Sequence, residues 1–105
     1  MIELKRDFTK KGVKYHQVWK DSNLIIYRCE RTDANDVYWE VFKPRIGKPN
    51  RFMNDEYEVY PSDESFGAWA WCCSSKKSIA KILKKHFSQN DCMLTNEEIA
   101  DFAVQ

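Results

Sequence analysis

The 105-residue sequence contains no long apolar run, no glycine-rich stretch and no pair of cysteines separated by two residues. A membrane-spanning helix needs about 20 mainly apolar residues, so none is expected. The glycines stand singly, at Gly12, Gly47 and Gly67, which excludes the glycine-rich loops that hold nucleotide phosphates. The sequence also lacks an excess of charge of one sign. A net charge of +1 means that attraction to nucleic acid or to an anionic membrane would have to come from local patches.

The spacing of the cysteines and histidines disfavours metal binding and redox chemistry. Zinc sites use closely spaced cysteines and histidines, whereas His16 and His86 are far apart in this sequence. The cysteines, which are isolated or directly adjacent, are Cys29, Cys72, Cys73 and Cys92. Without a secretion signal we expect reduced thiols. No serine lies in a strained, glycine-flanked turn, so we expect no enzymatic activity, no metal and no cofactor.

Aromatic residues make up 14% of the chain, which argues against intrinsic disorder. The length fits one domain, residues 1–105, with a core of its own at about residues 15–87. The opening residues, MIELKRDFTKKGVK, carry charges where a secretory signal needs an apolar stretch. We therefore expect a folded cytoplasmic protein.

Three β-branched and aromatic runs with short polar turns between them predict consecutive antiparallel strands. They span residues 15–20, 24–32 and 37–43. Residues 44–66 contain all three prolines and form a long loop, a type of segment that is commonly functional or mobile. Residues 57–60 predict a short edge strand within this loop, and residues 68–73 predict the last strand.

Residues 74–87 predict an amphipathic helix, with Ser74 or Ser75 as its N-cap. Its apolar stripe consists of Ile79, Ile82, Leu83 and Phe87. The spacing of Thr95 and Glu98 is that of a capping box and predicts a short C-terminal helix, residues 95–105. The predicted fold is α+β: a three- to four-stranded antiparallel sheet packed against one main amphipathic helix, plus this short helix.

The stretch FGAWAWCCSSKK leaves the two sheet faces ambiguous, because alternate residues of a strand point to opposite sides. In one interpretation the small residues lie under the main helix, and Trp69 and Trp71 face the other way. The small residues are Ala68, Ala70 and Cys72. In the alternative interpretation both tryptophans belong to the core. The strand around Trp39 repeats the ambiguity, since both of its faces carry large apolar groups.

The leading functional hypothesis is a non-enzymatic binding protein that recognises a larger host protein or ribonucleoprotein. Aromatic and arginine side chains supply most of the binding energy at protein interfaces. The expected aromatic anchors are Trp39, Trp69 and Trp71. The expected polar contacts lie in the long loop and are Arg45, Lys48, Arg51, Asp55, Glu56 and Glu58. A homodimer that hides an aromatic face is a further alternative, and no membrane partner is expected.

The second hypothesis is a nucleic-acid-binding module. Lysines cover the polar side of the main helix and would contact phosphates while aromatic side chains of the sheet stack on bases. These lysines are Lys77, Lys81, Lys84 and Lys85.

The element order of three strands and a helix, closed by WAWCCSSKKSIAKILKKHF, resembles AP2-type and integrase arm-binding DNA-binding domains over roughly residues 15–87. This resemblance implies DNA reading by the open sheet face. The tryptophans named above, together with Arg28 or Arg31, would take that role. In size and style, as in YPSDESFGAWAW, the chain also resembles small phage and mobile-element accessory proteins. Some of those inhibit bacterial defence systems, anti-CRISPR proteins among them, and the resemblance implies such an inhibitor.

Overall fold

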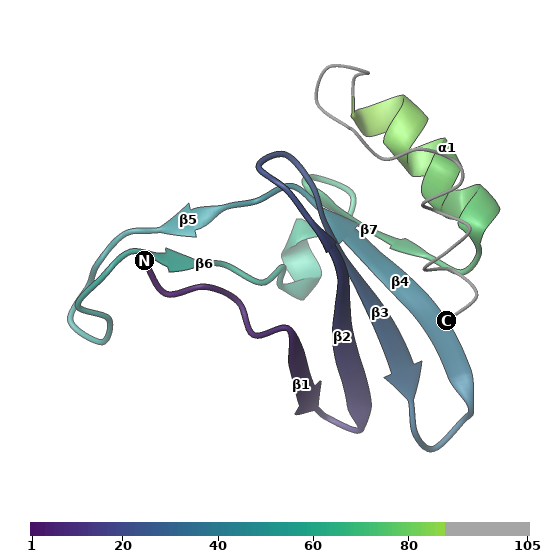
Figure 1. Cartoon of the computed structure of the whole chain (residues 1–105), viewed down its shortest axis with the longest axis horizontal. Coiled ribbons are helices and arrows are strands. Elements are labelled where there is room, and N and C mark those ends of the chain that lie inside the picture. Colours follow the sequence, from purple (N-terminus) through teal and green to yellow (C-terminus); the bar gives the residue numbers. More distant parts are fainter. Residues whose placement is uncertain (88–105) are drawn as a thin grey trace.

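The main sheet has five antiparallel strands in the order β1-β2-β3-β4-β7, as the computed structural model shows (Figure 1). Its strands are β1 (Asp7–Lys10), β2 (Val13–Lys20), β3 (Ile25–Arg31), β4 (Asp36–Phe42) and β7 (Ala70–Cys73). The predicted α+β class is confirmed, and β1 is an addition to the expected strands. The structure describes residues 1–87, so the expected helix at residues 95–105 lies outside the described residues.

A tight turn explains why β1 joins the sheet. Lys11 and Gly12 both have positive φ, 52° and 77°, the conformation of a type I′ turn, which matches the twist of a two-stranded hairpin. Phe8 of β1 then lies opposite Tyr15 of β2, and their rings stack with centroids 4.5 Å apart. The sequence did not predict β1, because the charged residues around it leave too weak an alternation of apolar and polar residues.

The predicted long loop, residues 44–66, contains structure of its own. Two short strands, β5 (Ile46–Gly47) and β6 (Tyr57–Glu58), pair with each other in a separate sheet, and a 3₁₀ helix follows at Asp63–Ser65. The expected edge strand at 57–60 is therefore β6, although it pairs with β5 and not with the main sheet. Figure 1 shows this hairpin extending away from the main sheet, beside the N-terminus.

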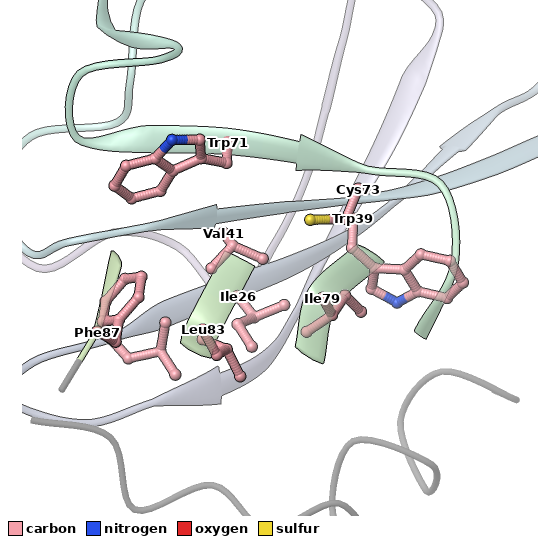
Figure 2. Close-up of a cluster of buried hydrophobic side chains, with 9 residues drawn as sticks. Ile26, Trp39, Val41, Trp71, Cys73, Ile79, Leu83 and Phe87 are labelled. Carbon is pink, nitrogen blue, oxygen red and sulfur yellow. The ribbon is translucent and has the colours of Figure 1, made fainter. Parts of the chain in front are cut away.

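The helix α1 (Lys76–His86) covers one face of the sheet near β7. Its N-cap is Ser75, whose hydroxyl accepts a hydrogen bond from the Ser78 amide. Figure 2 shows side chains of α1 and of three strands pointing toward one another. The buried cluster on this face contains Leu24, Ile26, Trp39, Val41, Trp71, Cys73, Ile79, Leu83 and Phe87.

The opposite face is covered by the chain that leads from β6 to β7. Its buried cluster is smaller and consists of Ile25, Tyr27, Cys29, Phe42 and Ala70. Partly buried side chains that pack against it include Phe8, Tyr15, Tyr38, Tyr60, Phe66 and Trp69. We refer to the two sides as the helix face and the loop face.

The expectation that the small residues Ala70 and Cys72 lie under the helix is wrong. Ala70 belongs to the loop-face cluster, Cys72 is exposed, and Trp71 lies under α1 with its ring stacked on His86 at 4.2 Å. The alternative, in which the tryptophans are core, holds for Trp71. The amides of residues 68 and 69 both donate to the Ser65 carbonyl in a turn, so the strand alternation begins only at Ala70. Residue 68 is accordingly outside the strand and exposed.

Candidate partner-binding site

The β5–β6 hairpin, residues 44–58, forms a structured arm. Its tip is a closed turn, because the amides of Asn50 and Met53 each donate to the carbonyl of the other, at 2.8 and 3.2 Å. The Asn50 side-chain oxygen also accepts hydrogen bonds from the amides of Phe52 and Met53, at 2.8 and 3.0 Å. Such an Asx turn fixes the backbone without help from tertiary packing. We call residues 48–53 the arm tip.

The base of the arm is held by the N-terminal segment. Ile2 donates to the Glu56 carbonyl and accepts from the Glu58 amide, at 2.8 and 2.9 Å, and so forms a parallel β-bridge with Tyr57 of β6. The Glu58 carboxylate accepts from Lys20 Nζ at 2.7 Å and from the Leu4 amide at 2.9 Å. Both bonds tie the arm to the body of the protein.

Tyr57 and Gly47 show why the two arm strands pair closely. A Cβ atom at Gly47 would lie 2.2 Å from the ring of Tyr57, so any side chain there would displace the ring. The two residues are direct cross-strand partners in the arm. The absence of a side chain at Gly47 therefore lets the Tyr57 ring lie directly over the neighbouring strand.

Phe52 is the most exposed large apolar side chain among the described residues, with 80% of its surface accessible. Arg51 places its guanidinium over the Phe52 ring, 4.8 Å from the centroid. Lys48 is exposed nearby in the sequence, and neither it nor Arg51 forms an ion pair within the described residues. The arm tip thus presents an aromatic ring and two cations to solvent on a hydrogen-bonded turn.

The expected polar contacts of the loop separate into two groups. Lys48 and Arg51 lie at the arm tip. Asp55 pairs with the N-terminal amine at 3.1 Å, and Glu58 is engaged as described above, so both act within the fold. The Glu56 side chain is exposed at the base of the arm. Phe52 was missed because a single aromatic residue in a polar loop has no periodicity; its only signal is its place in the turn sequence KPNRFMND.

The expected tryptophan anchors are not brought together. Trp39 and Trp71 are 6% and 8% exposed and lie beneath α1, so neither presents its ring to a partner in this fold. Trp69 is half-buried on the loop face, edge-on to Phe42. Arg45 covers the outer side of Trp69, with its guanidinium 4.9 Å from the ring centroid. This pair links the base of the arm to the sheet.

The lysines of α1 form a separate surface. All five are exposed, and none forms an ion pair within the described residues. They are Lys76, Lys77, Lys81, Lys84 and Lys85. The helix itself separates these lysines from the aromatic rings beneath it. The expected combination of basic helix and stacking sheet is therefore not assembled on one surface.

Three of the four cysteines lie in the described part of the chain, and all three are free thiols. Cys29 and Cys73 are buried, and desolvation raises the pKa of the Cys73 thiol to about 12. Burial also raises the pKa of Cys29 and of the exposed Cys72, so all three are protonated at neutral pH. Within residues 1–87, no group of three or more metal-ligating side chains is close enough to hold an ion. No helix in this part of the chain is long and apolar enough to cross a membrane.

Comparison with known proteins found no matching family model, and neither the curated proteins nor the solved structures gave a significant match. The functional assignment therefore depends on the chemistry of the arm tip and of the sheet faces.

Proposed function

We propose that the protein is a non-enzymatic binding protein that occupies a surface of a larger partner protein through its arm tip. The observation that carries the proposal is the 80% exposure of Phe52 on a turn closed by four hydrogen bonds. A fixed turn presents the ring at a low entropic cost of binding, since little backbone freedom remains to be lost. Aromatic and arginine side chains together are the usual energetic centre of a protein interface.

The chemistry of the tip defines the partner surface. Phe52 requires an apolar pocket, and the two cations beside it require acidic side chains at the rim of that pocket. Because the sequence resembles small phage accessory proteins in size and style, we extend the proposal to a bacterial defence complex as the partner. Binding there would block a surface that the complex needs, which is how an inhibitor without catalytic groups acts.

The experiment is a pull-down from nuclease-treated bacterial lysate with the tagged protein and two variants. Phe52→Ala should weaken the binding free energy by about 2 kcal/mol, which is roughly a thirtyfold loss of affinity. Capture of the partner should fall accordingly. The double variant Lys48→Ala and Arg51→Ala should weaken the same complex. If neither variant reduces capture of the partner, the arm tip is not the binding surface.

A charge-matched control separates the arm from α1. The double variant Lys81→Ala and Lys85→Ala also removes two positive charges, from exposed positions of the helix. It should leave capture of the partner unchanged. If the helix variant abolishes capture while the arm variant does not, the binding surface is α1.

A second function is favoured by one observation, namely that five exposed lysines and no acidic residue occupy α1. We infer that this surface contacts phosphates of a nucleic acid, without the base stacking expected from the sequence. Each phosphate contact releases counterions, so affinity should fall steeply with salt. A complex insensitive to salt would exclude this function.

A further inference from the structure

The loop face contains two adjoining cavities with volumes of about 410 and 290 Å³. Glu40, Asp63 and Phe66 line both of them, so the cavities form one groove that these three residues share. Cavities that hold small ligands start at roughly 300 Å³. The larger cavity therefore has room for one long side chain or a small molecule.

Strand pairing places Glu40 in the middle of the sheet. It lies between Tyr27 of β3 and Cys72 of β7 in the register. Its carboxylate accepts a hydrogen bond of 2.5 Å from the Tyr60 hydroxyl. Tyr60 is itself fixed by edge-on packing against the rings of Tyr27 and Phe42, with centroids 5.2 and 5.1 Å away. The position of the carboxylate is thus determined by the aromatic cluster.

No cation compensates Glu40 within the described residues. None of the ion pairs of this part of the chain includes it, although it is only partly accessible. Desolvation accordingly raises the pKa of its carboxyl group. A half-buried carboxylate without a cation costs stability, and such a cost is typical of a group retained for binding.

The wall of the larger cavity is suited to a flat cation. Its lining includes the carboxylates of Asp36, Glu40 and Asp63 but a single cationic side chain, Arg31. The Arg31 guanidinium lies over the Tyr38 ring, 5.7 Å from its centroid, so one face of this ring is already occupied by a cation of the chain itself. The smaller cavity is different, because two lysines, Lys10 and Lys11, line it. The charges of the lining therefore favour a bound cation in the larger cavity and not in the smaller one.

We propose that the larger cavity binds the guanidinium group of an arginine side chain presented by a partner protein. Glu40 and Asp63 supply the carboxylate oxygens, and Phe66 supplies aromatic surface. A guanidinium suits this combination because it donates two parallel hydrogen bonds in its plane and stacks on aromatic rings with its face. The site is independent of the arm tip, so the protein has two contact surfaces of opposite charge preference.

The test is a titration of the whole ¹⁵N-labelled protein with Nα-acetyl-arginine N-methylamide, followed by NMR. Saturable amide shifts are expected around Tyr38, Glu40 and Cys72, with a dissociation constant of about 1–10 mM for a single side chain. The matched control is the citrulline analogue, which has the same shape without the charge and should bind at least about tenfold more weakly. Equal shifts with both compounds, or none with either, would overturn the proposal.

Two variants locate the site. Glu40→Gln keeps an acceptor for the Tyr60 hydroxyl and should weaken binding roughly tenfold. Asp63→Asn, at an exposed position of the 3₁₀ helix, should weaken binding by a similar factor. Unchanged affinity in both variants would contradict the proposal. Agmatine, a small guanidine without a peptide backbone, separates the two sources of such a group. If agmatine binds more than tenfold tighter than the blocked arginine, the ligand of the cavity is a small molecule and not a partner protein.

Discussion

The two faces of the sheet differ in how they are closed. On the helix face, α1 inserts aliphatic side chains onto Trp39, Val41 and Trp71, and the resulting cluster contains no ionisable side chain other than the Cys73 thiol. On the loop face, an irregular segment with a 3₁₀ helix covers only part of the aromatic surface and leaves a groove around Glu40. The helix face is a closed apolar core, and we propose that the binding chemistry lies on the more open loop face and on the arm.

The largest effect should come from the helix face. Ile79 is fully buried between α1 and the sheet, so Ile79→Ala should lower the free energy of unfolding by about 2–5 kcal/mol through lost burial and a residual cavity. Urea denaturation measures it. The control is Ile82→Ala on the same helix, where the side chain is only partly buried and the loss should be clearly smaller. Equal losses would mean that α1 packs in another rotation.

The sequence predicts the helix of the helix face better than it predicts which residues of the sheet lie on each face. The α1 stripe, from Ile79 to Phe87, repeats with one period and was predicted correctly. The faces of β7 were not, because Trp69, Trp71 and the residues between them alternate between apolar types on both sides. The side to which each residue points depends on where the strand begins, and the turn in which residues 68 and 69 donate to the Ser65 carbonyl places that point at Ala70.

The candidate site was predicted in part. Lys48 and Arg51 were expected as contacts and lie at the arm tip. Trp39 was expected at the surface and is buried, since its exposure depends on the position of α1 and not on local sequence. Glu40 was not among the contact residues predicted from the sequence. Its position in the groove follows from cross-strand register and from the contact with Tyr60, 20 residues away, which no local pattern encodes.

The next largest effect should come from a buried hydroxyl on the loop face. The Tyr27 hydroxyl donates to the Lys5 carbonyl at 2.6 Å and accepts from Gln17 Nε2 at 3.0 Å. Tyr27→Phe leaves both groups without a partner and should cost about 1–3 kcal/mol of unfolding free energy. Tyr57→Phe is the control, since this hydroxyl makes no hydrogen bond to another described residue. A neutral effect of Tyr27→Phe would show that water replaces the hydroxyl.

A smaller effect, opposite in sign, is expected at Glu40. Because burial raises the folded-state pKa of this carboxyl above its ordinary 4.5, the ionised form costs stability at neutral pH. Glu40→Gln should raise the free energy of unfolding at pH 7 by up to about 1 kcal/mol. As pH falls through the raised pKa toward 4.5, the wild type takes up the proton and the advantage of Gln should disappear. A difference that is constant from pH 7 to 4 would contradict this account.

The smallest effect on stability should come from the arm tip. Phe52→Ala removes a ring that is 80% exposed, so the free energy of unfolding should change by less than about 0.5 kcal/mol. Thermal denaturation of the two proteins measures it. A loss above roughly 1 kcal/mol would mean that the ring is packed in solution, and it would remove the basis for treating Phe52 as a binding group.

The most direct test of the central claim is photocrosslinking with p-benzoylphenylalanine placed at position 52 and, separately, at position 85 of α1. Both positions are exposed, so each reports what contacts its own surface. The account predicts one protein partner crosslinked from position 52 in nuclease-treated lysate, displaced by an excess of untagged protein and absent from position 85. Crosslinks from position 85 alone, lost on nuclease treatment, would contradict it and transfer the binding function to the lysines of α1.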